Sequence, residues 1–342
     1  MHTRLPGPAR ARRATGSRRH GLRTVVRYAI VTFVAISLNF ALPRLAPGNV
    51  VDYLMPPEAA GSLTAEDRQQ VLRQFGLDKP VAEQYVDYLQ GIARGDLMIS
   101  ARYGRPVRDL LLERVGWTLL LVGSALVIAT SIGVFLGFRS GWRRGGRGDV
   151  GTLSAVLLAD SAPPFFVGSL LLLLFSVRLG WVPTFGARPW EGAQGFALIG
   201  GVLERLVLPL LTLVIANIGP VFLVARSAMI SELQEDYILG AEARGLSPAQ
   251  VRRHAQRNAL LPVSTVVLVS VGALVGGAAV IESVFSYPGL GRLIYESVVA
   301  RDYPVIQGAA LLLVLGVVVA NFLNDLLYPV LDPRVRGRRG RR

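Results

Sequence analysis

Residues 231–262 read SELQEDYILGAEARGLSPAQVRRHAQRNALLP and form a polar stretch between two hydrophobic runs. Leu233, Tyr237 and Ala241 recur every four residues, so they would share one face of a helix. Gly245 follows, and glycine tolerates the left-handed backbone with which helices commonly end. The first half of the stretch therefore predicts a short helix that stops at Gly245.

The second half predicts another helix directly after the turn. Ser247 and Gln250 have the spacing of a capping box, and Pro248 between them suits the first helical position. A basic segment follows and runs to Pro262. The whole stretch is thus expected to be a helix-turn-helix.

The flanking hydrophobic runs belong to a series of segments long enough to cross a bilayer. Of the 342 residues, 51% are hydrophobic, and about 20 apolar residues cross the hydrocarbon core. We predict an all-α integral membrane protein with six transmembrane helices and the helix-turn-helix between the fourth and fifth. The expected spans are residues 25–42, 116–138, 150–177, 203–224, 263–281 and 305–327.

These spans divide the chain into five expected parts. A disordered basic arm (1–24) precedes the first transmembrane helix (25–42), and a long polar insert (43–115) follows it. A five-helix core (116–330) contains the polar loop (226–262), and a basic tail (331–342) ends the chain.

The arginine-rich start of the chain has three possible interpretations. It could be an organelle transit peptide, or a twin-arginine export signal with Arg12-Arg13 and Arg18-Arg19. It could also be a cytoplasmic anchor that fixes the orientation of the first span. We favour the anchor, because the hydrophobic run that follows is long enough to span and no small-residue cleavage site is obvious.

Composition excludes several functions for the chain. There are no cysteines, and Lys79 is the single lysine, so a phosphate-binding GxxxxGK[ST] loop is absent. His2, His20 and His254 are too dispersed for an HExxH zinc site. We therefore expect no cofactor, no metal and no ATPase activity in this chain.

The distribution of arginines predicts the orientation. With both termini in the cytoplasm, the cytoplasmic segments hold 23 of the 37 basic residues, as the positive-inside rule requires. The net charge of +14 then reflects topology and lipid headgroup contacts rather than a nucleic-acid surface. The polar loop is placed in the cytoplasm and the 43–115 insert outside.

The polar loop contains, in this order, Tyr237, Ala241, Ala243, Gly245, Leu246, His254, Arg257, Asn258 and Pro262. This set resembles the cytoplasmic coupling loop of bacterial ABC-importer permeases, in the "B" subunit type of the dipeptide/oligopeptide/nickel family. The broader importer signature has Glu-Ala-Ala before the glycine, and here only Ala241 stands in register, after Leu239 and Gly240. The resemblance extends over residues 25–336.

The resemblance implies a transport subunit in the bacterial cytoplasmic membrane. Its expected partners are a second homologous permease in a heterodimer, two ABC ATPase subunits, an extracytoplasmic substrate-binding protein and membrane lipids. The implied ATPase-coupling residues are Tyr237, Ala241, Ala243, Gly245, Leu246, Arg253, His254, Arg257 and Asn258. The family carries di- and oligopeptides, and also nickel, glutathione or oligosaccharides, of which peptides are preferred on breadth. A secondary transporter or a membrane-embedded enzyme is a more distant alternative.

Two polar residues inside the spans are candidates for the translocation path. Asp160 lies three residues before Pro163-Pro164, which would kink the third span. An ionisable group in hydrocarbon is functional by default. The alternative is a structural role at the water boundary. Asn217 lies in the fourth span and would line the path or, more often, form a helix–helix hydrogen bond.

Two further segments fit the family pattern. Glu282, Phe285, Pro288 and Gly289 lie after the fifth span, where they would form an extracytoplasmic gate or a simple turn before a surface helix. The insert contains FGLDKPVAEQYVDYLQGIARGDLMIS (75–100), with Met98 where the family usually has glycine. The insert is expected to form short amphipathic helices that pack on the spans or face the binding protein.

Overall fold

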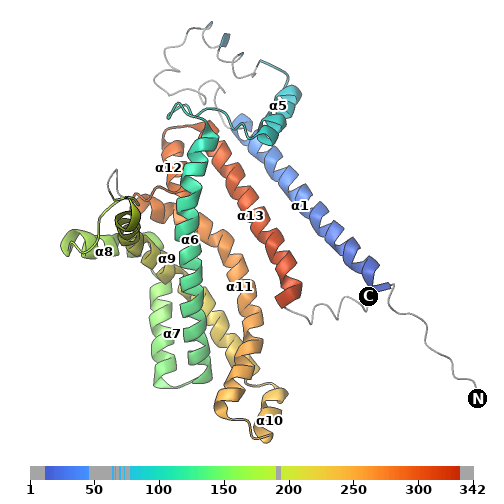
Figure 1. Ribbon diagram of the computed structural model, residues 1–342, viewed down its shortest axis with the longest axis vertical. Coiled ribbons are helices and arrows are strands. Elements are labelled where there is room, and N and C mark those ends of the chain that lie inside the picture. The colour runs from blue at the N-terminus through green and yellow to red at the C-terminus, as the bar shows by residue number, and fades with distance from the viewer. Residues whose placement is uncertain are drawn as a thin grey trace, which may run out of the picture.

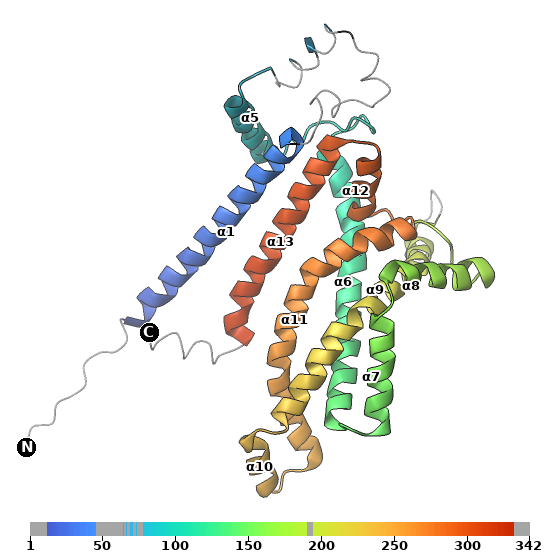
Figure 2. The same ribbon diagram turned by 180° about the vertical axis from the view of Figure 1, so that it is seen from behind.

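The computed structural model describes residues 12–45, 64, 66, 69, 70, 73, 78–189 and 194–331. Every regular element in this part of the chain is a helix, and one isolated β-bridge joins Ile99 to Pro106 (Figure 1). The all-α prediction is confirmed. Helices α5 and α10 lie at opposite ends of the molecule in both views (Figures 1 and 2).

The long helices have the length and composition of membrane spans. Four described segments qualify singly, namely Thr24–Ala41 within α1 (Arg12–Leu45), α6 (Val107–Trp142), α9 (Gly195–Glu232) and Tyr303–Phe322 within α13 (Tyr303–Leu331). A bent pair of helices qualifies as a fifth. Helix α11 (Pro248–Val284) is 37 residues long, and the six-span count remains a prediction.

The helices extend beyond the predicted spans. Helix α1 begins at Arg12, so residues 12–24 are helical where a disordered arm was expected, and residues 1–11 lie outside the described chain. Helix α6 begins at Val107, inside the expected insert, and α9 continues to Glu232. Arginine, leucine and glutamate favour helices, so a helix continues past the bilayer until a breaker stops it.

The third predicted span is a bent pair rather than one kinked helix. Helix α7 (Arg147–Asp160) is followed, after Ser161–Pro163, by α8 (Pro164–Leu171) and the π-helix η1 (Leu172–Arg178), and the pair bends by 95°. Pro163 is extended, with ψ 133°, because a following proline disfavours helical backbone in the residue before it. As a result α8 projects sideways from the bundle (Figures 1 and 2).

Close packing between α6 and α9 forms the centre of the bundle. A Cβ added at Gly137 would lie 2.6 Å from the Cβ of Ala225, and one at Gly133 would lie 2.9 Å from Val221. Gly141 continues the series, with the Arg226 carbonyl 2.8 Å from the position of its added Cβ. The three glycines are spaced by four residues, which lets two membrane helices approach closely.

The insert packs on the first span through α5 (Val81–Arg94). Asn39 of α1 is 7% exposed and donates hydrogen bonds to the Tyr88 hydroxyl at 3.0 Å and to the Gln307 carbonyl at 2.9 Å. These contacts support the packing alternative for this helix. Met98, in the loop after α5, has φ +68°, so the turn keeps the left-handed backbone that a glycine would adopt more easily.

Candidate functional site

The predicted helix-turn-helix is present at one end of the molecule. Helix α10 (Asp236–Ala243) buries Ile238 and Ala241, each 3% exposed, against the ends of α6, α9 and α11. Leu233 is not on this helix, because α9 continues through Glu232 and Leu233 caps its end. The prediction that Leu233, Tyr237 and Ala241 share one face of this helix was therefore wrong for Leu233. The four-residue spacing also missed Ile238, which is buried.

The turn forms as the residues predict. Gly245 has φ +78°, and the amide of Leu246 donates to the Ala241 carbonyl at 3.2 Å, which closes the end of α10. The next helix starts with the predicted capping pair, since the Ser247 amide donates to Gln250 Oε1 at 2.8 Å. The geometry around Gly245 thus fixes the angle between α10 and α11.

Tyr237 links α10 to both of its neighbours. Its hydroxyl donates to Glu232 Oε2 at 2.5 Å, and the side chain of Asn258 on α11 also hydrogen-bonds to it. Partial burial, followed by the hydrogen bond to Glu232, raises the pKa of Tyr237 to about 12. The hydroxyl therefore stays protonated at physiological pH and keeps its donor role.

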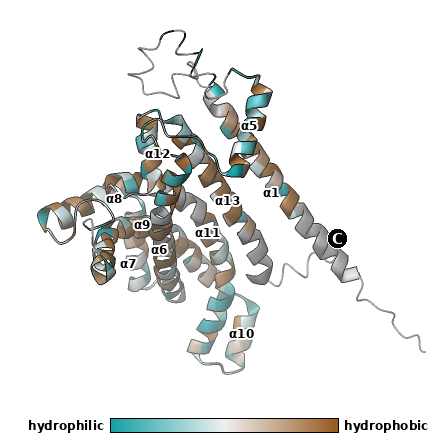
Figure 3. Ribbon diagram, turned by 45° about the horizontal axis from the view of Figure 1, so that its top comes forward, coloured by the Kyte–Doolittle hydropathy of each residue, from teal (hydrophilic) through white to brown (hydrophobic). Residues whose placement is uncertain are grey.

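The coupling residues named from the sequence divide into two groups. Ala241 is buried and anchors α10 to the bundle, while Leu246 and Asn258 are half-buried. Five are exposed, namely Ala243, Gly245, Arg253, His254 and Arg257, and Tyr237 is 37% exposed. Figure 3 shows mixed colours on α10 and hydrophilic colours at the adjoining start of α11, in contrast to the hydrophobic spans. The loop thus presents a polar outer surface on a packed inner face.

A buried ion pair next to this loop was missed by the sequence analysis. Arg226 of α9 binds Asp149 of α7 through two hydrogen bonds of 2.8 Å, and Asp149 is 3% exposed. Ser140 and the Gly145 amide, at 2.9 Å, also donate to this carboxylate. Four donors thus tie the α6–α7 turn to α9. The sequence signal was an acidic residue two positions after Arg147 in an otherwise basic loop.

The two path candidates lie on neighbouring helices. Asp160 ends α7 and is exposed, and a Cβ added at Gly219 of α9 would lie 2.3 Å from its Oδ1. Because α7 has 14 residues, Asp160 lies about 21 Å along its axis. Asn217 donates to the Leu213 carbonyl of its own helix at 2.7 Å. Asp160 therefore lies against Gly219 of α9 with its side chain exposed, whereas the amide of Asn217 bonds within its own helix.

The four gate candidates lie close together in a turn that is packed into the protein interior. Glu282 is fully buried, accepts hydrogen bonds from Thr118 Oγ1 at 2.6 Å and from the Arg292 amide at 3.1 Å, and lies against Gly289. Phe285 is 3% exposed and Pro288 is half-buried. These residues hold the start of α12 (Leu290–Val299). We call the turn of Glu282, Phe285, Pro288 and Gly289, together with the hydrogen bonds of Glu282, the Glu282 clamp.

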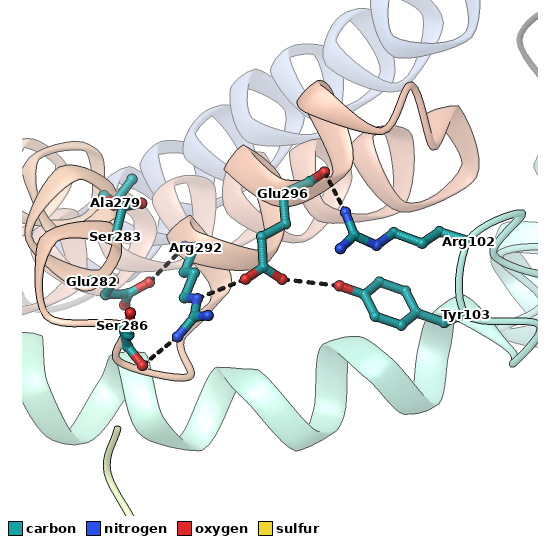
Figure 4. A network of polar contacts seen from close by, with 8 residues as sticks. All are labelled: Arg102, Tyr103, Ala279, Glu282, Ser283, Ser286, Arg292 and Glu296. Atoms are coloured by element: carbon teal, nitrogen blue, oxygen red, sulfur yellow. Dashed lines mark hydrogen bonds and ion pairs between the residues drawn. The ribbon is translucent and has the colours of Figure 1, made fainter. Parts of the chain in front are cut away.

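The clamp continues into the insert (Figure 4). Arg292 bonds Glu296 at 2.7 Å, and Glu296 accepts a hydrogen bond from the Tyr103 hydroxyl at 3.0 Å. Burial, followed by this contact with Glu296, raises the pKa of Tyr103. Asp302 is 1% exposed and accepts from Ser100 and from the Arg102 amide, the latter at 3.2 Å. A continuous polar network therefore joins the insert to the end of α11.

Metal chemistry has no site in the described residues, where no cluster of three or more His, Asp or Glu side chains occurs. A polar loop packed on the bundle at one end and a hydrogen-bonded clamp at the other are joined by the long helices.

Comparison with known proteins identifies the class. Residues 129–337 match the family described as "Binding-protein-dependent transport system inner membrane component", and the chain belongs to this family. It is accordingly a transmembrane permease subunit of the ABC-importer type, whose ATPase is a separate chain.

The relatives cover nearly the whole chain. The "Di/tripeptide transport system permease protein DppB" of Pseudomonas aeruginosa is 37% identical over 327 residues, covering 91% of this chain and 96% of that protein. The "Oligopeptide transport system permease protein AppB" of Bacillus subtilis is 34% identical over 315 residues, covering 92% and 97%. In fold, the chain is similar to a chain of the MetNI methionine ABC transporter in an inward-facing conformation, with a TM-score of 0.53, 19% identity and coverage of 65% and 96%.

Proposed function

We propose that this permease translocates di- or oligopeptides delivered by an extracytoplasmic binding protein. The observation that carries the proposal is the similarity, over about nine-tenths of the chain, to relatives whose names specify peptide transport. Nickel, glutathione and oligosaccharides are the competing substrates within the same importer family. The proposed assembly contains a second homologous permease and two ABC ATPase subunits.

The proposed coupling element is the α10 loop. Ile238 and Ala241 hold α10 on the ends of α6, α9 and α11, so a push on its exposed face moves these helices together. The proposed ATPase contacts are the exposed residues Ala243, Gly245, Arg253, His254 and Arg257, with Tyr237 at their edge. Rigid-body movement of packed elements is a common way to switch between two states. ATP-driven closure of the ATPase pair would thereby change the packing of the spans.

The proposed orientation places α10 and both termini in the cytoplasm, with six spans in total. The α10 end carries the arginine-rich turn between α6 and α7, as expected for a cytoplasmic face. The insert and the Glu282 clamp then face outward, where a binding protein docks. The clamp network supports a role for Glu282, Phe285, Pro288 and Gly289 in a gate, because it links them to the insert.

Co-purification and uptake test the function together. The full chain is purified from its native membrane in mild detergent, and its partners are identified by mass spectrometry. Recovery of a P-loop ATPase and a second permease supports the importer, and ATP-dependent uptake of a labelled dipeptide into liposomes supports the substrate. A chain that is recovered alone and transports without ATP contradicts the importer mechanism. An assembled importer that takes up nickel or an oligosaccharide but no peptide contradicts only the substrate.

Gly245→Val should uncouple ATP hydrolysis from transport. The left-handed backbone at φ +78° costs a non-glycine residue about 1–2 kcal/mol and a β-branched one more, so the turn would relax and redirect α10. We expect at least a tenfold loss of peptide uptake with ATPase activity retained. Gly245→Asn, which tolerates this conformation, should retain most of the uptake. Normal uptake by the valine variant at normal membrane levels would refute the coupling role of the turn.

Asp160→Ala should reduce transport without loss of assembly. The carboxylate is exposed and lies over Gly219 of α9, which suits a side chain of the translocation path. Uptake and co-purification of the partner subunits are measured together. Asp160→Asn keeps the shape and removes the charge, so an equal loss with asparagine assigns the effect to the charge. Loss of assembly in both variants would support the structural role instead.

A further inference from the structure

A cavity of about 640 Å³ lies between α6 and α11 at the end of the molecule that carries α10. Its volume is within the range of pockets that hold small-molecule ligands, about 300–1,000 Å³. It is separate from the exposed coupling residues, from the clamp and from Asp160. None of the functions described above uses it.

The walls of the cavity are apolar and aromatic. Phe135, Phe138 and Trp142 recur at three- and four-residue intervals, so they line one face of α6, and Leu260 faces them from α11. Phe135 is 64% exposed. Because α6 has the composition of a membrane span, this side of the cavity is suited to a hydrocarbon chain.

The end of the cavity next to the α6–α7 turn is cationic. Arg139 and Arg143 are one helical turn apart on and after α6, and Arg252 joins them from α11. No acidic residue lines the cavity, and within the described chain these three arginines form no ion pair. Nearby Arg226 differs, since Asp149 neutralises it. The cavity therefore presents uncompensated positive charge at one end of an apolar channel.

We propose that this cavity binds an anionic phospholipid. The headgroup phosphate contacts Arg139, Arg143 and Arg252, and one acyl chain lies along Phe135 and Trp142. The charge selects an anion, and the apolar walls select an amphiphile over a free phosphate ion. Basic pockets between membrane helices on the cytoplasmic side recognise lipid headgroups in this way.

The test uses the assembled importer, with phosphatidylglycerol and phosphatidylcholine as probes. Native mass spectrometry measures how many molecules of each lipid the complex retains and with what apparent Kd. The variant R139Q/R143Q removes two charges at the cavity, and the control R144Q/R147Q removes two charges from the same turn outside its lining. Because an arginine that contacts the headgroup contributes about fivefold in affinity, we expect the first variant to lose at least about tenfold in phosphatidylglycerol binding. The control should lose less than about twofold.

The outcomes separate the sources of affinity. Equal losses in the two double variants would show diffuse surface charge and overturn the site. Equal retention of both lipids by the unmodified complex would show unselective boundary lipid and overturn it as well. Displacement of phosphatidylglycerol by millimolar inorganic phosphate would show an anion site without lipid specificity. If a double variant does not assemble, R143Q against R144Q at adjacent positions gives the same comparison. None of these results depends on whether the transported substrate is a peptide.

Discussion

Arg226→Met should destabilise the protein more than any single substitution on its surface. The substitution leaves the carboxylate of Asp149 buried with no cation, since the side chain of Asp149 is only 2% exposed and that of Arg226 is 20% exposed. Removing one partner of a buried ion pair costs about 3–5 kcal/mol. We expect the lower end of this range, because Ser140 and the Gly145 amide still donate to Asp149. The free energy of unfolding is measured by titrating the protein with a denaturant in mixed micelles.

A matched control is available in the exposed pair Arg105–Glu113. Its side chains are 50% and 52% exposed, so water replaces the lost contact in Arg105→Met and stability should be unchanged within error. The double variant R226M/D149L should recover part of the loss, because no unpaired charge remains buried. If R226M and R105M had the same effect, the buried pair would not stabilise the α6–α7 turn.

Gly291→Ala should disrupt the clamp at the opposite end of α11. The added Cβ would lie 2.2 Å from the Cα of Ala279, and backbone cannot rotate away as a side chain can. The start of α12 would have to move, and with it the amide of Arg292 that donates to Glu282. Overpacking of this kind costs about 1–3 kcal/mol, and we expect the upper end. Thermal unfolding of the purified complex and peptide uptake are both measured, and both should fall.

Gly277→Ala provides the same chemical change on α11 without the clash. No atom lies within 4 Å of a Cβ added at Gly277, and alanine is more favourable than glycine in a helix by about 1 kcal/mol. This variant should therefore be neutral or slightly more stable. A loss in G277A as large as that in G291A would mean that helix flexibility, rather than the close contact with Ala279, determines the result.

Local features of the coupling loop could be predicted from the sequence because neighbouring residues determine them. Gly245 adopts the left-handed backbone, and Ser247 bonds Gln250, as their spacing indicated. The position of Leu233 could not be predicted in the same way. Helix α9 has no breaker before Glu232, so it continues through a segment that periodicity had assigned to the next helix.

Tertiary contacts account for what the sequence did not show. Pro163-Pro164 predicted a kink, but the 95° direction of α8 depends on what the helix packs against. Asp149 and Arg226 are 77 positions apart, and charge counting had assigned Arg226 and the basic loop to topology and lipid headgroup contacts. Glu282 was named from the sequence as a gate candidate, but its burial could not be predicted, because its partner Thr118 lies on a different helix.

Helix α11 has a mechanical consequence through its position between the two ends of the protein. It is one helix of 37 residues with Pro262 in its interior, running from the coupling turn to the Glu282 clamp. At 1.5 Å per residue, Pro262 lies about 21 Å from the coupling end and about 33 Å from Val284. If the helix swung as a rigid body about this proline, each ångström of travel at the α10 end would become about 1.6 Å at the Glu282 end, by the ratio of the two lengths. Such a lever would lengthen the movement at the expense of force, which would suit opening a passage more than compressing its contents.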